Sequence, residues 1–410
     1  MRGAVMKRFL LAIIFLLSLT NFACAEPAKN FSESVENFCW KYFAVREHDK
    51  NFLYSPYGIH SALSILANGA SGETRKKILD VLEVDNVETL NDGHKNFSAF
   101  VKKNYRGENF FVEANLLLVD KKIIGRGFNE NFKRVVTADY NSEVRAANFG
   151  GDIRGEQKKI RRWVADKTKN FVVNYNSIAD ANTLTDFANV VCFDGKWATP
   201  FKPSQTAEKE FKNCDGSNGT VAMMSNVFKN KIKYRADEKF KAIELPYSAN
   251  AAMYLILPTD DDALNVAELW NAQTFSYRAN FFDALKKSSA FDGEVVVRLP
   301  NLTMEYDTFI AEDFIKLGLR RLFTDDAEFF NIVKDTSLKI SNARHYCRID
   351  INEQGTKAAA VTEITMVETT AAHDFEPPRR IYFIANRPFL FVIRDVQSGV
   401  ILFAGAVNKF

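Results

Sequence analysis

Side chains that could carry out hydrolytic chemistry are spread thinly along this chain. The histidines lie far apart, at His48, His60, His94, His345 and His373. The sequence contains no G-x-S-x-G nucleophile elbow, no H-E-x-x-H zinc motif and no phosphate-binding glycine loop. We therefore expect no catalytic residues, no metal site and no cofactor. A hydrolase whose Ser/His/Asp set is assembled from distant segments is the alternative.

A polar stretch near the C-terminus could serve as a site of proteolytic cleavage. It reads EQGTKAAAVTEITMVETTAAHDFEPPRR, residues 353–380, and the strand-like block IYFIANRPFLFVIRDVQSGVILFAGAVNKF follows it. The stretch offers too little apolar surface to offset the entropy lost on ordering it, which is typical of an exposed loop or linker. The sequence therefore predicts a soft, cleavable loop directly before the last strands.

The first half of this loop alternates as a β-strand does. Its even positions from Thr356 to Met366 are small or apolar until Glu368, whereas its odd positions carry Lys357 and Glu363. A strand made from residues 356–369 would bury the uncharged face and leave the charged face in water. It would span roughly 46 Å, against a radius of gyration of about 21 Å for a compact domain of this size. The pattern predicts that the loop can enter a sheet as a long new strand.

The N-terminus has the order of a secretory signal peptide. Basic residues, an apolar run over residues 9–19 and the small-residue site Ala23-Cys24-Ala25 follow one another. The apolar run is shorter than the roughly 20 residues that a spanning helix needs. We expect cleavage after Ala25 and a secreted, extracellular protein, with no membrane span. N-glycosylation sequons suit this location and occur at Asn30, Asn96, Asn218 and Asn301.

Cysteine usage and charge give few further constraints. An even number of cysteines remains after Ala25, namely Cys39, Cys192, Cys214 and Cys347. They permit disulfides, but their spacing fits neither a metal site nor a dense disulfide framework. The densest basic segment, KKIRRWVADKTK at residues 158–169, is interpreted as the solvated face of a helix with a buried stripe, and a polyanion site is the alternative.

Helical and strand patterns occupy different parts of the chain. Ser55 should cap a helix that has Pro56 at its first position and ends at Gly69, and Ser71 should cap a second helix. After about residue 180 the runs FANVVCF, AIELPY, AAMYLILP and EVVVRLP predict strands. No linker divides the sequence, so a helical first third followed by strands indicates a single α+β domain over residues 26–410.

Five blocks, in order, resemble one protein family. They are NFLYSPYGIHSALSILANGASGETRKKIL, NVVCFDGKWATPF, EVVVRLPNLTMEYD with LGLRRLFTDDAEF, RIDINEQGTKAAAVT, and FIANRPFLFVIRDVQSGVILFAGAV. They are similar to blocks of the serpin family, in particular to insect-like or other invertebrate-like extracellular members. The resemblance implies about nine helices around three β-sheets and a reactive-centre loop at about residues 353–380. In the family, a target protease cleaves this loop and is trapped as an acyl-enzyme when the loop inserts into the main sheet.

The resemblance also implies roles for individual residues. The hinge residues are Glu353, Gly355, Thr356, Ala358, Ala359 and Ala360. The sheet-opening residues are Ser55, Asn189, His345 and Trp197. This sequence departs from the family pattern at Gly58, where a second serine is usual, and at Asn301, which replaces a lysine that often pairs with Glu353.

The cleaved bond depends on how the loop is counted. Counting fifteen residues from Gly355 places it between Thr369 and Thr370, with Ala371, Ala372 and His373 as alternatives. Counting back from NRPF reaches Pro377 instead, because the second half of the loop is longer than the family pattern. We prefer the count from the hinge, since the inserted length determines how the protease is trapped. Arg379 and Arg380 would attract a trypsin-like enzyme, but cleavage there would leave a slack tether.

These observations favour a secreted serine-protease inhibitor that is consumed in its reaction and is not an enzyme. A small residue at the cleaved bond suggests that the partner is a serine protease with a small, elastase-like primary pocket. The formal net charge of +3 gives no reason to expect nucleic acid, and we expect a monomer without a membrane partner. The alternative is a non-inhibitory serpin that acts as a carrier, storage or signalling protein.

Overall fold

Three β-sheets and the helices around them make up the described part of the chain. The computed structural model describes residues 29–410 apart from 108–109, 126, 335, 337 and 357–377. Within these residues there are nine α-helices and three sheets, which confirms the expected α+β class and element composition. The α-helices are α1 Lys29–Ala44, α2 Pro56–Gly69, α3 Gly72–Leu82, α4 Val87–Asn104, α5 Glu130–Tyr140, α6 Phe149–Lys167, α7 Val266–Asn271, α8 Phe275–Lys287 and α9 Ala311–Lys316.

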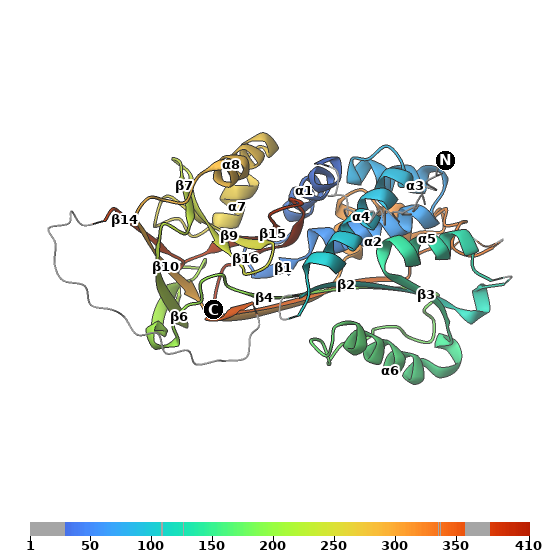
Figure 1. Ribbon diagram of the computed structural model, residues 1–410. Coiled ribbons are helices and arrows are strands. Elements are labelled where there is room, and N and C mark those ends of the chain that lie inside the picture. The colour runs from blue at the N-terminus through green and yellow to red at the C-terminus, as the bar shows by residue number, and fades with distance from the viewer. Residues whose placement is uncertain (1–28, 108–109, 126, 335, 337, 357–377) are drawn as a thin grey trace, which may run out of the picture.

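The main sheet has the strand order β11-β12-β13-β4-β2-β3. Its strands are β11 Leu302–Phe309, β12 Asn342–Asn352, β13 Gly355–Thr356, β4 Thr185–Lys196, β2 Phe110–Asp120 and β3 Ser142–Ala147. Figure 1 shows this sheet between α2, α4 and α5 on one side and α6 on the other. The predicted run FANVVCF forms the middle of β4.

Two further sheets occupy the other end of the molecule. The second six-stranded sheet, in spatial order, consists of β1 Phe52–Tyr54, β16 Ile401–Val407, β15 Phe389–Asp395, β9 Ala251–Pro258, β8 Phe240–Pro246 and β7 Lys233–Ala236. The four-stranded sheet consists of β14 Arg380–Ile384, β10 Glu294–Pro300, β6 Asn218–Lys229 and β5 Ala207–Lys212. The predicted strands AIELPY, AAMYLILP and EVVVRLP correspond to β8, β9 and β10.

Strand β2 corrects the expectation that the first third of the chain is helical. Its sequence, FFVEANLLLVD, runs between β4 and β3 in the interior of the main sheet. Ala114 and Leu116 pack in the cluster that contains α6, and Leu117 and Val119 pack with the helices on the opposite face. A strand buried on both faces carries a continuous apolar run in place of an alternating pattern, so periodicity does not distinguish it from a helix.

Helix α2 begins and ends where the sequence predicts. The Ser55 hydroxyl accepts the backbone N–H of Gly58 at 3.0 Å, Pro56 is the first helical residue and Gly69 is the last. Almost every residue of the helix is buried. The reason is that α2 contacts both β4 of the main sheet and β16 of the second sheet. Its cap therefore lies inside the molecule, against the main sheet.

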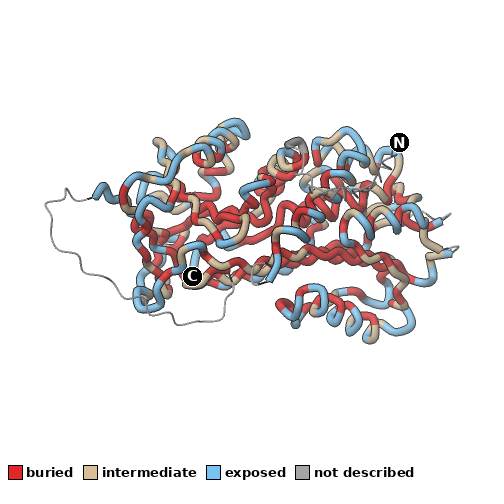
Figure 2. The backbone as a smooth tube through the Cα atoms, in the orientation of Figure 1, coloured by how far each residue is buried: buried red, intermediate tan, exposed pale blue. Residues whose placement is uncertain are grey.

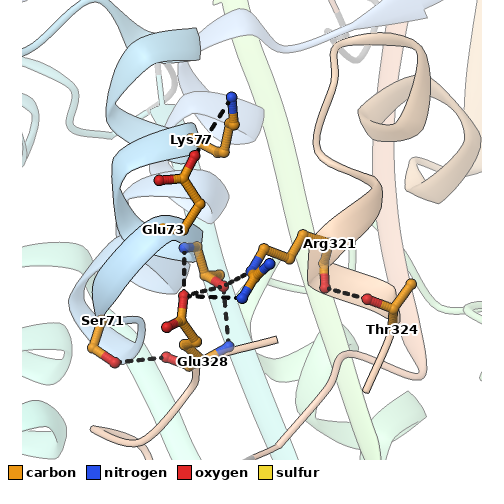
Figure 3. A network of polar contacts seen from close by, with 7 residues as sticks. Ser71, Glu73, Lys77, Arg321, Thr324 and Glu328 are labelled. Carbon is orange, nitrogen blue, oxygen red and sulfur yellow. Dashed lines mark hydrogen bonds and ion pairs between the residues drawn. The ribbon is translucent and has the colours of Figure 1, made fainter. Parts of the chain in front are cut away.

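Helix α3 is capped differently from the prediction. Ser71 occupies the N-cap position, but its hydroxyl donates to the backbone carbonyl of Glu328 at 3.2 Å and caps nothing in its own helix. The Glu328 carboxylate accepts the backbone N–H of Thr74 at 3.0 Å and forms an ion pair with Arg321 at 3.4 Å (Figure 3). A carboxylate distant in sequence thus takes the capping role and ties α3 to the segment that precedes β12.

Burial is most complete on the inner strands β2 and β4 of the main sheet (Figure 2), whereas the edge strand β11 alternates between buried and exposed residues. On the outer face of the sheet, α6 and the segment after it form a cover, in which Trp163 and Tyr175 pack with Val190 of β4 and Tyr346 of β12. The rings of Tyr175 and Tyr346 meet edge to face at 6.0 Å. The cover therefore crosses the boundary between β4 and β12.

Candidate loop-insertion site

The beginning of the 353–380 loop already forms part of the main sheet. Strand β13 lies between β12 and β4, where Thr356 pairs with Ile351 on one side and with Gly195 on the other. Both pairings are antiparallel. Gly355 and Thr356, the third and fourth residues of the loop, are therefore seated as a strand between two longer strands.

Below β13 the two longer strands pair with one another directly. Residues 342–348 of β12 lie in parallel register with residues 186–192 of β4. We call this pairing the β4–β12 seam. A strand that continued from Thr356 along the same line would have to separate the seam, because it would occupy the same hydrogen-bonding edges.

Thr356 is fully buried and has a specific partner. Its exposed fraction is 0%, and its Oγ1 lies 2.8 Å from the hydroxyl of Tyr247. The Tyr247 ring stacks on Trp197 with ring centroids 4.4 Å apart. The inward direction assigned to Thr356 from the alternation agrees with this contact. Tyr247 was not among the residues singled out from the sequence, since nothing local marks a tyrosine that lies 109 positions from its partner.

Side chains from three separate segments hold Glu353 and its neighbours. One oxygen of Glu353 accepts the Thr206 hydroxyl at 2.7 Å, and the other accepts Nδ2 of Asn301 at 3.4 Å. Trp197 donates its indole N–H to the carbonyl of Asn352 at 2.9 Å. The residue that replaces the usual lysine therefore still contacts the hinge, but through a long hydrogen bond from an uncharged amide in place of an ion pair. Thr206 supplies the shorter contact and was missed from the sequence.

The backbone conformation of Gly355 and its close contact with β4 allow only a glycine at this position. Its φ angle is +152°, and an added Cβ would lie 2.1 Å from the carbonyl oxygen of Gly195. Such a contact is far shorter than van der Waals distance and involves rigid backbone. The chain can pass this closely to β4 only because a glycine stands here.

A chain of hydrogen bonds crosses the β4–β12 seam. Nε2 of His345 accepts the backbone N–H of Ser55 at 3.0 Å, so Nδ1 carries the proton and donates to Oδ1 of Asn189 at 2.7 Å. Burial lowers the pKa of His345 to about 3, and the ring is therefore neutral at physiological pH. Ser55, Asn189 and His345, which were assigned to sheet opening, thus lie together, whereas Trp197 lies at the hinge.

The same chain continues on β2 to a carboxylate that the sequence analysis missed. Nδ2 of Asn189 donates to Oδ1 of Asn115 at 2.8 Å and to Oε1 of Glu113 at 3.3 Å, and Asn115 also donates to Glu113. Burial raises the pKa of Glu113 to about 7, although hydrogen bonds from Ser61, Asn115 and Asn189 oppose the rise. A sequence signal existed, because Glu113 and Asn115 stand two apart within an apolar run and so share one face of a strand.

Gly58 does not leave a gap in this network. A Cβ added at Gly58 would lie 2.5 Å from Cγ2 of Val191 and 2.8 Å from Oδ1 of Asn189. The space that a serine side chain would need is already filled by these two residues of β4. The departure at Gly58 is thus compensated by the packing of Val191 and Asn189.

The rest of the loop assignment lies outside the described residues. This applies to hinge residues Ala358, Ala359 and Ala360, to the Thr369–Thr370 bond and to its alternatives Ala371, Ala372 and His373. The chain is described again from residue 378, where the carbonyl of Arg379 accepts the backbone N–H of Glu294 at 2.8 Å. Arg380 begins β14 and pairs with the Glu294 carboxylate at 2.5 Å. Cleavage at this arginine pair would require unpairing β14 from β10.

The remaining candidate positions are scattered over the surface and the core. Asn218 is exposed, Asn96 and Asn301 are partly buried, and Asn30 lies in α1. No disulfide joins the four cysteines of the described chain. Residues 29–410, with the gaps given above, contain no group of three or more His, Cys, Asp or Glu side chains that could hold a metal ion. None of the described helices is long and apolar enough to cross a bilayer.

A six-stranded sheet in which a short strand precedes a parallel seam, together with two further sheets and the surrounding helices, defines the class of protein. Residues 33–410 match the protein family described as Serpin (serine protease inhibitor). The chain therefore belongs to the serpin family, and the predicted resemblance is confirmed. Most members of this family inhibit proteases.

Individual relatives cover nearly the whole chain. The sequence is 29% identical over 401 residues to antithrombin-III of Mus musculus, covering 95% of this chain and 82% of that protein. It is 28% identical over 367 residues to intracellular coagulation inhibitor 2 of Tachypleus tridentatus, covering 88% of this chain and 86% of the relative. The structure of the thermophilic serpin tengpin in its native state superposes with a TM-score of 0.81 at 24% identity, over 93% of this chain and 95% of that one. This likeness establishes the serpin fold.

Proposed function

We propose that this protein is a secreted inhibitor of a serine endopeptidase that acts by loop cleavage, covalent trapping and loop insertion. The observation that carries the proposal is the position of Thr356. It is buried and hydrogen-bonded between β12 and β4, directly above the β4–β12 seam. Because Thr356, the first residue of the 356–369 stretch that would insert, is already seated, the insertion path is defined before any protease binds.

The reaction follows from ordinary serine-protease chemistry. The protease serine attacks the carbonyl carbon of Thr369, the bond to Thr370 breaks, and an ester joins the protease to the loop. The loop then enters the seam behind Thr356 and carries the esterified protease with it. Full insertion of residues 356–369 would form a strand roughly 46 Å long, with the esterified protease at its far end. Deacylation fails because the catalytic groups of the dragged protease no longer hold their productive geometry.

The residues around the cleaved bond favour a protease that accepts small side chains. Threonine and alanine dominate residues 369–372, and an elastase-like primary pocket suits them. The arginine pair is disfavoured as a target, because Arg379 and Arg380 are both engaged by Glu294. We further propose that the protein acts outside the cell as a glycosylated monomer, based on the signal-like N-terminus and the sequons.

Incubation with a panel of serine proteases tests the inhibitory function. A serine protease specific for small residues should give a covalent complex that survives detergent electrophoresis. Mass spectrometry should show that the released C-terminal fragment begins at Thr370. Clean cleavage by every protease, without any complex, would instead identify a non-inhibitory serpin such as a carrier or storage protein. Turnover of a substrate without consumption of the protein would indicate a hydrolase.

A further inference from the structure

The strands that border the β4–β12 seam keep the same register along the whole of their contact. Ile351 of β12 and Gly195 of β4 lie opposite Thr356. Further along the seam, Arg344 pairs directly with Ala188. The difference between the two residue numbers is the same in both pairs, so the register is continuous. A strand that continued from Thr356 would therefore have, at each step, one defined neighbour on β4 and one on β12.

Lys357 would enter the sheet between two carboxylates. One step beyond Thr356 in this register, the neighbours are Asp194 of β4 and Asp350 of β12, which are both partly buried. The side chain of Thr356 is buried on the inner face, opposite α6, so the next residue projects from the outer face. Directly opposed residues of neighbouring strands share a face and interact. Asp350 also binds Arg348 of its own strand at 3.2 Å, but the lone pairs of a carboxylate can serve a second cation.

Further along the same face, a loop glutamate would meet a buried arginine. In the continued register Glu363 lies between Ala188 and Arg344. Arg344 is 8% exposed, and its guanidinium donates to the carboxylate of Asp307 and to the carbonyl of Asn176. Insertion that displaces the α6 cover would break the bond to Asn176 and leave a buried donor unsatisfied, which is costly. Glu363 would supply an acceptor of opposite charge in its place.

Insertion would also change the partner of Arg344 on the side of β4. Burial raises the pKa of Asp186 to about 6 and the charge of Arg344 opposes the rise, so the two groups interact across the seam. An inserted strand would separate β4 from β12 by two strand spacings, roughly 9.6 Å. Asp186 would then lie opposite the uncharged Thr365, and Glu363 would take its place beside Arg344.

The same charges oppose a slip of two residues, which the alternation of the loop would allow. A slip of one residue turns the apolar face outward, but a slip of two keeps it inward. A slip of two in one direction would set Lys357 against Arg348, and it would set Glu363 against Asp186. A slip in the other direction would set Lys357 against Lys196. Like charges that lie directly opposite one another in neighbouring strands are destabilising.

We propose that Asp194, Asp350 and Arg344 are positioning residues that receive the charges of the inserting loop and fix its register. The inference rests on the proposed function, because it concerns the path that the loop takes into the sheet. Lys357 and Glu363 lie outside the described residues and are the only charged side chains between positions 356 and 366 of the sequence. Each of them meets a residue of opposite charge in the register that β13 begins.

Thermal unfolding of intact and cleaved protein tests this register. The quantity measured is the rise of the midpoint when the loop is cut between residues 367 and 377, so effects on the intact fold cancel. Lys357→Glu should reduce the rise by roughly 2 °C, because two attractive cross-strand pairs become repulsive. Addition of Asp194→Lys makes one of these pairs attractive again and should recover about half of the loss. Asp166→Lys makes the same change of charge on the exposed side of α6 and should recover none of it.

A second pair of variants tests the far part of the register. Glu363→Gln should reduce the rise by roughly 1 °C in the parent. In the Arg344→Gln background the same change should have no effect, because the partner of the glutamate is absent. If Arg344→Gln fails to fold, the cycle of Lys357 and Asp194 still decides the question.

The outcomes separate this inference from the proposed function. A rise in the parent, together with losses at Lys357 that Asp194→Lys does not relieve, would overturn the register while leaving insertion intact. No rise in the parent after cleavage would overturn the proposed function, and this inference with it.

Discussion

Glu113 has a pKa that its buried surroundings raise into the physiological range. It lies on β2 in a buried network, where Asn115 and Asn189 donate to its carboxylate. Burial dominates over these hydrogen bonds, and the pKa of the group rises to about 7. Asn189 links the carboxylate by hydrogen bonds to His345, whose bond to Asn189 crosses the β4–β12 seam. The charge of Glu113 therefore changes within the physiological pH range at one end of the network that crosses the seam.

Changing Glu113 to Gln should remove a pH dependence of stability. Folded Glu113 keeps its proton up to about pH 7, whereas an unfolded glutamate releases it near 4.5. The folded state thus binds more protons across this window, and the free energy of unfolding falls as the pH rises through it, by about 3 kcal/mol. In Glu113→Gln this fall should be absent, so the variant should be more stable than the parent above about pH 7.

Denaturant unfolding of parent and variant over a pH series measures this difference. Asp186→Asn is a useful comparison, because burial raises the pKa of Asp186 from 3.8 only to about 6. Its effect should therefore be complete at a lower pH than that of Glu113→Gln. Parallel stability curves for the parent and Glu113→Gln would show that Glu113 ionises at its ordinary pKa in the folded protein.

The helices and strands that the sequence predicted correctly are those determined by residues close together in the chain. The α2 cap at Ser55 and the strands β8, β9 and β10 depend on residues close in sequence, and they were predicted correctly. The α3 cap was wrong because its acceptor, Glu328, is 254 positions from Thr74. β2 was missed because burial on both faces removes the alternation that identifies a strand.

The candidate site shows the same dependence on sequence distance. Family resemblance pointed to Ser55, Asn189 and His345, which the structure brings together across the β4–β12 seam, and to the hinge, of which Gly355 and Thr356 lie between the same two strands. The contacts of Thr356 with Tyr247 and of Glu353 with Thr206 join residues 109 and 147 positions apart. No local pattern encodes such pairs, because they arise only when β4, β8 and the hinge pack together.

Substitution of Thr356 by Arg should convert an inhibitor into a substrate. The position is fully buried beneath Tyr247, so an arginine must either leave the sheet or bury an unpaired charge. Both outcomes delay insertion and let the protease complete hydrolysis. Detergent electrophoresis should show the cleaved protein in place of the complex.

Two conservative variants control for this result. Thr356→Ser keeps the hydroxyl and should form the complex in parental yield. Tyr247→Phe leaves Oγ1 of Thr356 without its partner and should destabilise the protein by about 1 kcal/mol without blocking complex formation. Parental complex yield from Thr356→Arg would show that insertion does not begin at this residue.

In the whole molecule, insertion would exchange one type of strand pairing for another. The seam is a single parallel ladder, whereas β13 is antiparallel to both of its neighbours. A loop continuing from β13 would replace one parallel ladder by two antiparallel ladders, which are also slightly more stable per residue. The opposing cost is displacement of the α6 cover, where Arg344 of β12 donates to the carbonyl of Asn176 and Tyr175 packs on Tyr346.

Cleavage of the loop should therefore stabilise the whole molecule. About ten additional backbone hydrogen bonds, each worth about 1 kcal/mol net, would raise the thermal midpoint by roughly 12 °C, because the unfolding entropy of a chain of this size is about 0.8 kcal/mol/K. Circular dichroism of intact and cleaved protein measures the shift, with the cut located between residues 357 and 377 by mass spectrometry. Cleaved Thr356→Arg should show a much smaller rise, because its loop enters poorly. An unchanged midpoint after cleavage of the parent would mean that the loop stays outside the sheet, and trapping by insertion would then be impossible for this protein.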